Sequence, residues 1–404
     1  MLRKVWLIKM EEDLPIDVDP YPSRMSVIAD VLCKEFCVTR FASQLDHKRN
    51  KARDSAGKVL IKKNYELHLI KSFFRYENSK YLRFFHIYFS AIQLLTTFIR
   101  TKEKPDLIIC AMPSPVNCFV SAVYKKLFSK RTKLILDARD LWPEILSDEL
   151  NHSLVAKCLT CVMNVELKYA VKNSDGFLGV SEYFSSYLNR YAESEIPTQA
   201  FYLLPGSSSQ DTLNADQYRF NVPLRDKLVF VFGGTISKTS YTELLRFMQL
   251  FPDSDDRVLL ICGDGYYYKE LQALNTQENI HVLGYVEYTK FNYIKGLSSY
   301  GLICVENRND YKNSLSNKFF DYLFSGLPII TNVDGLLSHT IVNNNIGFVY
   351  RSDDDLRSLL RSDEISSAAG LSVLKSSVKK CGETVFCENV NNKNLISFVH
   401  KTLQ

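Results

Sequence analysis

A lysine at the start of a predicted helix carries the clearest chemistry in this sequence. Ser316 is a suitable N-cap, the residues after it have helical spacing, and Gly326-Leu327-Pro328 ends the helix. A helix start presents unpaired backbone N–H groups and the positive end of the helix dipole. Lys318 in the first turn would therefore complete a site for a diphosphate. Asp321, one turn further on, could accept hydrogen bonds from sugar hydroxyls. A capped amphipathic helix with solvated charges would show the same pattern.

Three glycine turns follow predicted strands in the same half of the chain. Gly233-Gly234 permits close approach of the backbone to an anion, with Lys238 available as a counter-charge. Gly284-Tyr285-Val286 would place backbone groups beside a nucleobase, and Gly263-Asp264-Gly265 forms a further turn. Ordinary strand-to-helix turns would also account for each of them.

Charged residues in the first half point to the handling of a second substrate. Arg139-Asp140 directly follows the predicted strand Lys133 to Asp137, and Trp142-Pro143 beside it predicts a rigid, partly buried turn. Asp46-His47 would supply an acid or base, because histidine titrates near neutral pH. A surface salt bridge and an exposed loop histidine are the structural alternatives.

The elements that must position these residues alternate between short β-branched runs and amphipathic stretches. This pattern predicts an α/β fold with helices on both faces of a parallel sheet, and it occurs twice. The first-half strands are predicted at Lys4 to Ile8, Val38 to Phe41, Asp106 to Cys110, Lys133 to Asp137 and Gly176 to Val180. The second-half strands are predicted at Leu228 to Phe232, Arg257 to Cys262, His281 to Leu283, Tyr300 to Val305, Pro328 to Thr331 and Gly347 to Tyr350.

The length of 404 residues exceeds what one hydrophobic core supports, which agrees with two Rossmann-like domains. We place the N-terminal domain at residues 1–205 and the C-terminal domain at 206–385. A last helix at 386–404 is predicted to pack back on the first domain. Ligands of open α/β sheets lie outside the carboxyl ends of the strands, so a site is expected in a central cleft between two facing domains.

The charge distribution suggests an anionic partner for the first domain. Residues 47–133 contain 19 Lys and Arg against 5 Asp and Glu, a net charge of +14, while the whole chain carries +5. Aromatic and basic residues alternate in residues 58–104, which suits an interface rich in anionic lipid. A buried aromatic helix with a solvated basic face is the alternative.

The ten cysteines lie mostly among apolar neighbours, which is typical of reduced core residues in a cytoplasmic protein. Cys158 and Cys161 form a lone Cys-x-x-Cys without a second pair, so we expect no metal site. The four apolar residues Val5 to Ile8 are too few for a secretory signal. Phe84 to Ile99, the longest weakly polar stretch, is shorter than a spanning helix, and no transmembrane segment is expected.

The segment from Ser314 to Ile330 resembles the donor-binding helix of family 4 glycosyltransferases. The resemblance is strongest to the branch that makes bacterial surface polysaccharides such as O-antigen and capsule. That branch has the pattern Pro-Ser-Lys-Leu-Phe-Glu-Tyr-Leu-Ala-Ala-Gly-Lys-Pro, which is matched here at Lys318, Tyr322, Gly326 and Pro328. Asp321 falls on the second acidic position of the family's Glu-x7-Glu pattern, and the first acidic position is occupied by Asn313.

Other matches follow in family order along nearly the whole chain. Asp137-Ala138-Arg139-Asp140-Leu141-Trp142-Pro143 matches the branch's Asp-x-Arg-Asp-Leu-Trp-Pro, its most specific motif. Val5 to Ile8, Arg24 and the Ala42 to Lys48 stretch resemble its opening strand, first-helix Arg and Thr-Ser-x-x-Asp-His-x-x-Lys. Many relatives carry an Arg directly after the first glycine of the Gly233 turn and a Lys five residues later. These positions are Gly234 and Thr239 here, and Lys238 is the candidate substitute.

The resemblance implies a GT-B fold and a retaining transfer of a hexose or N-acetylhexosamine without a bound metal or resident cofactor. The catalytic residues would be Arg139, Asp140, Lys318 and Asp321. A UDP- or GDP-sugar donor would contact Gly233, Gly234, Lys238, Gly263, Gly265, Gly284, Tyr285, Val286, Asn313, Ser316, Asn317, Lys318 and Asp321. The acceptor and membrane side would be Arg24, Asp46, His47, Lys48, Arg75 and Arg83.

The acceptor implied by the resemblance is a polyprenyl-diphosphate-linked glycan at the inner face of the plasma membrane. The protein would then be cytoplasmic and peripherally bound to that membrane, with no nucleic acid as partner. Two other functions remain open from the sequence. One is a nucleotide-sugar epimerase of the same fold, and the other is a non-catalytic basic protein that binds membranes or nucleic acid.

Overall fold

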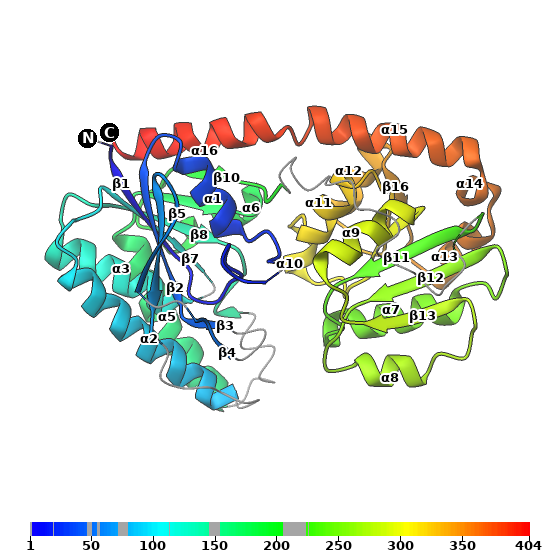
Figure 1. The fold of residues 1–404 in the computed structure, drawn as a ribbon, viewed down its shortest axis with the longest axis horizontal. Coiled ribbons are helices and arrows are strands. Elements are labelled where there is room, and N and C mark those ends of the chain that lie inside the picture. The colour runs from blue at the N-terminus through cyan, green and yellow to red at the C-terminus, as the bar shows by residue number, and fades with distance from the viewer. Residues whose placement is uncertain are drawn as a thin grey trace. The chain divides into compact units, whose positions relative to one another are not determined.

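The computed structural model describes residues 2–18, 20–46, 51–54, 57–71, 80–112, 114–144, 154–204, 224 and 226–404, without the side chains of 80–84 and 154–156. The chain divides into two compact units. The N-terminal unit contains residues 1–203 together with 391–404, and the C-terminal unit contains residues 204–390 (Figure 1).

The N-terminal unit is built on an eight-stranded sheet with the order β10-β9-β8-β7-β1-β2-β6-β5. Neighbouring strands run parallel except for β5, which pairs antiparallel with β6. The strands are β1 (Lys4–Ile8), β2 (Cys37–Ser43), β5 (Gly57–Lys62), β6 (Tyr65–Ile70), β7 (Leu107–Ala111), β8 (Lys133–Ala138), β9 (Gly176–Gly179) and β10 (Thr198–Ala200). A separate two-stranded ribbon joins β3 (Leu45–Asp46) to β4 (Lys51–Ala52).

Helices cover both faces of this sheet, because alternate side chains of each strand point to opposite faces. Trp6 and Ile8 of β1 belong to one buried cluster, and Val5 and Leu7 belong to another. The first cluster packs against α2 (Lys80–Arg100), α3 (Pro115–Phe128) and α5 (Leu154–Lys172), and the second against α1 (Arg24–Leu32) and α16 (Glu388–Thr402). The shorter α6 (Glu182–Tyr187) and the 3₁₀ turn η1 (Leu188–Tyr191) follow β9.

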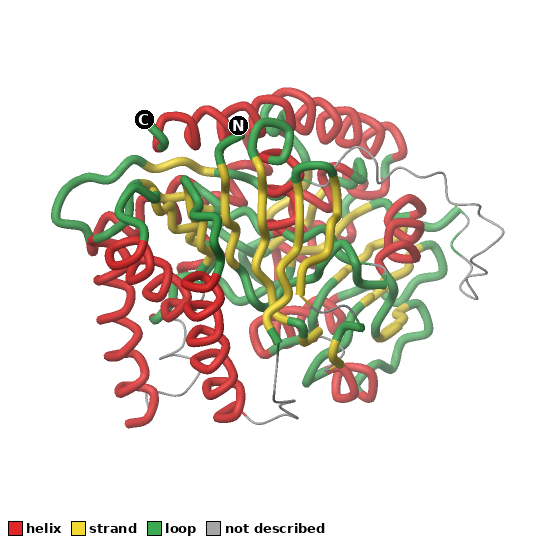
Figure 2. The backbone as a smooth tube through the Cα atoms, turned by 60° about the vertical axis from the view of Figure 1, so that its left-hand side comes forward, coloured by secondary structure: helices red, strands yellow, loops and turns green. Residues whose placement is uncertain are grey.

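The C-terminal unit has a six-stranded, fully parallel sheet with the order β13-β12-β11-β14-β15-β16. Its strands are β11 (Leu228–Gly233), β12 (Arg257–Cys262), β13 (Ile280–Gly284), β14 (Tyr300–Ile303), β15 (Ile329–Thr331) and β16 (Gly347–Val349). Its helices are α7 (Lys238–Leu250), α8 (Tyr268–Ala273), α9 (Tyr288–Leu297), α10 (Asn309–Lys312), α11 (Asn317–Phe324), α12 (Leu336–Asn344), α13 (Asp353–Arg361), α14 (Asp363–Ser366) and α15 (Ala368–Thr384). The helices lie alongside the strands in layers (Figure 2).

Each sheet has a point where the direction of strand addition reverses. In the C-terminal unit the first strand, β11, lies between β12 and β14. In the N-terminal unit the first strand, β1, lies between β2 and β7. Loops diverge at such a switch point and leave a crevice at the carboxyl edge, where ligands of this class of fold bind.

The predicted fold class of two doubly wound α/β domains is confirmed, and every predicted strand is present. We did not predict β10, the β3–β4 ribbon or the β5–β6 hairpin from the sequence. Lys58 and Lys62 lie on the strand β5. The alternative of a helix with a solvated basic face is therefore wrong for these two residues. The connector predicted at residues 200–210 begins at the last residue of β10, and its part from 205 lies outside the described residues.

Residues from the end of the chain complete the N-terminal unit. Leu395, Phe398 and Val399 of α16 are buried in its core. Asn391 and Tyr202 exchange hydrogen bonds, with Nδ2 donating to the carbonyl at 3.0 Å and Oδ1 accepting from the amide at 3.0 Å. The core of this unit is thus assembled from both ends of the described chain.

All ten cysteines are free thiols, and Cys158 and Cys161 are exposed on α5. Across the residues that the structure describes, no group of three histidine, cysteine or carboxylate side chains is arranged to hold a metal ion. No helix among the described residues combines the length and hydropathy needed to cross a membrane.

Candidate functional site

The turn after β11 brings the backbone unusually close to Lys318. Gly234 has a φ of 138°, and a Cβ at this position would lie 2.5 Å from Cε of Lys318. Gly233 is equally constrained, since a Cβ there would lie 2.0 Å from the ring of Phe291. The amide of Gly233 donates a hydrogen bond to the hydroxyl of Tyr322 at 3.0 Å. Both glycines are therefore needed for the turn and α11 to pack together.

Lys318 carries a positive charge that has no anionic partner within the described part of the chain. Its ammonium lies 4.0 Å from the centre of the Phe232 ring, on the aromatic face. Burial lowers the pKa of Lys318 to about 8, and the charge of the Cys304 thiolate form acts weakly in the opposite direction. A partly buried ammonium without a carboxylate partner favours the binding of an anion.

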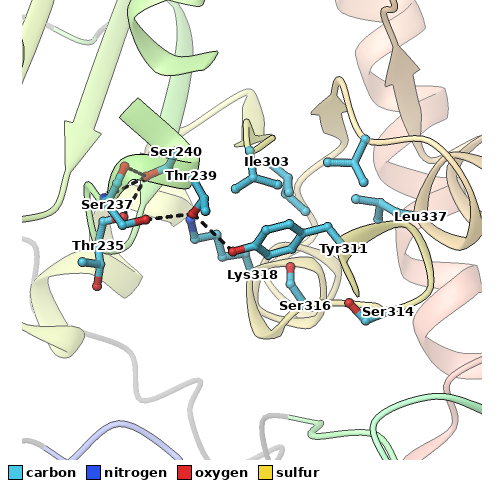
Figure 3. A pocket seen from close by; sticks show the side chains of 12 residues that line it. Thr235, Ser237, Thr239, Ser240, Ile303, Tyr311, Ser314, Ser316, Lys318 and Leu337 are labelled. Carbon is cyan, nitrogen blue, oxygen red and sulfur yellow. Dashed lines mark hydrogen bonds between the residues drawn. The ribbon is translucent and has the colours of Figure 1, made fainter. Parts of the chain in front are cut away.

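A cavity of about 240 Å³ lies at the carboxyl ends of β11, β14 and β15 and includes Lys318. Figure 3 shows side chains from helices, from a strand and from the loops between them around it. The lining residues are Thr235, Ser237, Thr239, Ser240, Ile303, Val305, Tyr311, Ser314, Ser316, Lys318, Val333 and Leu337. The cavity therefore occupies the switch point of this sheet.

Hydroxyl groups supply most of the polar lining. The hydroxyls of Ser237 and Thr239 lie 2.9 Å apart, and those of Thr239 and Tyr311 lie 3.3 Å apart (Figure 3). Ser316 Oγ is buried, and no residue in the described part of the chain forms a hydrogen bond with it. Hydroxyls can donate to an anion or accept from a sugar, so this lining suits a ligand that carries both kinds of group.

The two helices that start beside the cavity are capped differently. Ser237 and Ser240 form a reciprocal capping box at the start of α7, which satisfies backbone donors there. Ser316 is the N-cap residue of α11, as predicted, but its side chain makes no capping hydrogen bond. The first turn of α11 contains no acidic residue either. The positive end of the α11 dipole is therefore not neutralised by an acidic side chain of its own first turn and can interact with a bound anion.

The structure separates Lys238 from this cavity. Lys238 is the exposed first residue of α7 and is not among the lining residues, whereas its neighbour Thr239 is. Asn317 is also exposed. Asn313 donates hydrogen bonds to the carbonyl and side chain of Asn309 at 2.8 and 3.0 Å. The role of Lys238 as a counter-charge to the donor stays a prediction, and the structure shows only that its side chain is exposed and does not line the cavity.

Asp321 is directed toward a partner inside the fold. It is 8% exposed, and its carboxylate lies 3.7 Å from the ammonium of Lys295, which is itself 2% exposed. Burial lowers the pKa of Lys295, while the charge of Asp321 acts to raise it. The predicted role of Asp321 on sugar hydroxyls stays a prediction, and the structure shows its carboxylate buried against a lysine of α9.

Gly263 and Gly265, which were also predicted to contact the donor, allow neighbouring loops to pack closely. A Cβ on Gly263 would lie 1.9 Å from the carbonyl oxygen of Gly234, and one on Gly265 would lie 2.5 Å from that of Ile236. Gly284, at the end of β13, has a φ of 72°, which lies in the left-handed region that favours glycine. Tyr285 after it is 67% exposed, and Val286 is partly exposed. The β12 loop thus packs on the β11 loop.

In the N-terminal unit, most charges at the carboxyl edge are paired. Arg24 is 1% exposed, and its guanidinium binds both carboxylate oxygens of the fully buried Asp137 at 2.7 to 3.1 Å. It also donates to the carbonyl groups of Phe201 and Gly179. The acceptor-side role of Arg24 stays a prediction, and the structure shows its donors used within the protein.

Arg139 and Asp140 lie at this edge, directly after β8. Arg139 donates to Glu12 at 2.5 Å, and Arg40 donates to the other oxygen of Glu12 at 2.9 Å. Asp140 is exposed. The two arginines hold the pKa of Glu12 below its usual range despite its burial. Arg139 therefore combines an ionised internal partner with a partly exposed guanidinium.

The other acceptor-side residues are only partly covered by the structure. Asp46 is 7% exposed in β3. His47, Lys48 and Arg75 lie outside the described residues, and only the backbone of Arg83, in α2, is described. Sequence reasoning did not find Lys9, Glu12, Arg40, Lys295 or Tyr311. Lys9 and Glu12 come shortly after the end of a predicted strand. This position in the sequence could have identified both of them as candidate site residues.

The chain is similar to known enzymes in its fold but not in its sequence. No family model matches the chain, and no curated protein matches it by sequence. Sucrose-phosphate synthase from Thermosynechococcus elongatus is similar over 99% of this chain and 98% of its own, with 12% identity and a TM-score of 0.73. HepE of Anabaena, solved in complex with UDP and glucose, is similar over 99% and 100%, with 12% identity and a TM-score of 0.64.

A third similar structure is that of WaaG, a glycosyltransferase involved in lipopolysaccharide biosynthesis. The likeness covers 97% of this chain and 98% of WaaG, with 12% identity and a TM-score of 0.62. The chain thus has two parallel-sheet α/β domains of the GT-B fold, as HepE and WaaG do.

Proposed function

We propose that this protein is a glycosyltransferase that uses a nucleotide sugar as donor. The observation that carries the proposal is the ammonium of Lys318, which lacks an anionic partner among the described residues and lines a cavity at the switch point of the C-terminal sheet. A nucleotide sugar brings a diphosphate and sugar hydroxyls, and the cavity offers one cation, hydroxyls and a helix N-terminus. The complex of HepE with UDP and glucose adds support from a protein of the same fold.

The proposed reaction is a retaining transfer of a hexosyl or N-acetylhexosaminyl group from UDP or GDP. Negative charge builds on the departing diphosphate as the bond to the anomeric carbon breaks. Lys318, the first turn of α11 and the cavity hydroxyls would stabilise that charge, so the proposed reaction needs no bound metal. Arg139 and Asp140, in the N-terminal unit, are the residues proposed to act on the acceptor.

The proposed acceptor is a polyprenyl-diphosphate-linked sugar or oligosaccharide in surface-polysaccharide synthesis. An exposed apolar stripe on α2 supports a lipid surface as partner, because Phe85, Phe89, Ile92 and Ile99 repeat at helical spacing. Their side chains are 76%, 37%, 61% and 46% exposed. Arg100 ends the helix and Lys102 and Lys104 follow it, which suits anionic lipid head groups. We place the protein on the cytoplasmic face of the plasma membrane.

A panel of UDP- and GDP-sugars tests the donor. We expect one nucleotide sugar to stabilise the protein thermally and to be hydrolysed slowly without acceptor. Interconversion of UDP-sugars at C2 without transfer would establish an epimerase. Absence of stabilisation by every donor would favour a non-catalytic binding protein.

Co-sedimentation with vesicles tests the membrane partner. Wild-type protein is expected to bind vesicles that contain anionic lipid and not purely zwitterionic ones. Phe85→Asp and Ile92→Asp should reduce binding at least tenfold, since a charge on the apolar stripe opposes burial in the interface. Val373→Asp, at an exposed position of α15, is the matched control. Equal binding by all these variants would exclude the stripe as the docking surface.

A further inference from the structure

The cavity that includes Lys318 has two ends of different chemistry. The segment after β11 and the first turn of α7 supply hydroxyl groups, among them that of Thr235. The other end is an apolar wall of four aliphatic side chains from β14, from the segments after β14 and β15, and from α12: Ile303, Val305, Val333 and Leu337. In Figure 3, Thr235 and Leu337 lie on opposite sides of the view, with Lys318 and Tyr311 between them.

The apolar wall offers a ligand few hydrogen-bond partners. Its four side chains are only 1% to 7% exposed. Asn332 engages the backbone of Val305, accepting from the amide at 3.2 Å and donating to the carbonyl at 2.8 Å. The hydroxyl of Thr331 accepts from the amide of Val333 at 3.1 Å and donates to the carbonyl of Ile303 at 2.8 Å. A ligand hydroxyl against this wall would lose hydrogen bonds to water, whereas a methyl group would gain from burial.

We infer that the sugar of the donor carries a methyl group, which packs against the apolar wall. This inference rests on the proposed function, in which Lys318 holds the diphosphate. The transferred sugar is bonded directly to that diphosphate, so one of its substituents can reach a wall of the same cavity. The cavity hydroxyls would bind the hydroxyls of the sugar ring. The methyl group belongs either to an acetamido group or to C6 of a 6-deoxyhexose, and both present the same apolar surface.

The nucleoside end of the donor fits the apolar wall less well. Uracil and guanine carry no methyl group and present several hydrogen-bonding groups at their edges, and the ribose adds further hydroxyls. Against the wall these groups would lose their hydrogen bonds to water without replacement from the backbone groups that Asn332 and Thr331 already engage. The wall is therefore assigned to the sugar and not to the nucleoside.

Calorimetric titration with matched nucleotide sugars tests the inference. UDP-glucose is the reference, UDP-N-acetylglucosamine adds the acetamido group, and UDP-6-deoxyglucose has hydrogen in place of the C6 hydroxyl. The corresponding galactose compounds, and GDP-mannose with GDP-6-deoxymannose, extend the comparison to other ring configurations and to the other nucleotide. One methyl-bearing sugar should bind about 10-fold more tightly than its partner, the usual effect of one methyl-sized group in an apolar pocket. The pair that shows the difference identifies the source of the methyl group.

Variants of the apolar wall locate the preference. Val333→Thr keeps the size of the side chain and adds a hydroxyl, so it should remove most of the preference for the methyl-bearing sugar. Leu337→Met keeps the wall apolar and should retain the preference. Val342→Thr, at an exposed position of α12, is the matched control. The nucleoside diphosphate alone should bind wild type and Val333→Thr equally, because it carries no methyl group.

The outcomes separate this inference from the proposed function. Equal binding within every matched pair, by a protein that binds UDP or GDP, would overturn the inference and leave the proposed function in place. A preference that survives Val333→Thr would also overturn it, because the methyl group would then lie elsewhere. Weaker binding of the nucleoside diphosphate to Val333→Thr would overturn it as well, because the nucleoside would then contact the wall. A protein that binds neither UDP nor GDP would contradict the proposed function itself.

Discussion

The carboxyl edges of the two sheets use charge in different ways. At the N-terminal edge, arginines are largely satisfied inside the protein: Arg24 by Asp137, and Arg40 and Arg139 by Glu12. At the C-terminal edge, the cavity contains hydroxyls and one lysine that no described carboxylate neutralises. Paired charges hold loops in place, whereas an unpaired charge is available to a ligand. The comparison supports the proposed role of Lys318 toward a substrate, whereas the donors of Arg24 are used within the fold.

Replacement of Lys318 is expected to have the largest effect on activity. Lys318→Ala should lower kcat/KM for sugar transfer by about 100- to 1000-fold, the usual cost of removing one group that stabilises a developing anion. The melting temperature should stay the same or rise, because a buried ammonium without a partner is removed. Lys375→Ala, an exposed lysine of α15, is the control. Unchanged transfer by Lys318→Ala would exclude the cavity as the donor site.

Replacement of Arg24 should mainly lower stability, whereas replacement of Lys318 should mainly lower activity. Arg24→Met leaves Asp137 buried and uncompensated, which is expected to cost about 3–5 kcal/mol of unfolding free energy. Tryptophan fluorescence in denaturant measures this for the N-terminal unit. The double variant Arg24→Met/Asp137→Leu should recover most of the loss. If Arg24→Met instead lost activity at an unchanged free energy of unfolding, Arg24 would act on the substrate.

The pH dependence of donor binding sharpens the comparison further. Free Lys318 has a pKa of about 8, so its charge is present below pH 8 and is lost as the pH rises through that value. A diphosphate binds the charged form, and the dissociation constant should therefore rise about tenfold between pH 7 and pH 9. Calorimetric titration with the nucleoside diphosphate measures it. Lys318→Gln should bind weakly with a flat profile, and a flat profile in wild type would contradict the assignment.

Lys238 should show the smallest effect. It is exposed, and screening by water limits an exposed charge to roughly 0.2–1 kcal/mol, which is about a five-fold change at most. Lys238→Ala should therefore shift the donor dissociation constant by no more than that in the same titration. A loss close to that of Lys318→Ala would mean that the lysine turns into the cavity when the donor binds.

The fold and Lys318 were accessible from the sequence because both leave local patterns. Strand runs alternate with helical periodicity, and the spacing from Ser316 to Gly326 defines a capped helix with its lysine in the first turn. The ion pair of Asp321 with Lys295 was not accessible, because the two residues lie on different helices and only packing brings them together. Tyr311 and Thr239 were missed for the same reason, since their shared hydroxyl contact spans 72 positions.

The contribution of α16 to the first unit affects how the protein is made. During synthesis the ribosome releases residues 1–203 and then the whole of residues 204–390 before residues 391–404 emerge. Until then, the surface that Leu395, Phe398 and Val399 later cover stays open. The second unit can therefore fold before the first is closed, and the nascent N-terminal unit exposes apolar surface to chaperones until translation reaches the last helix.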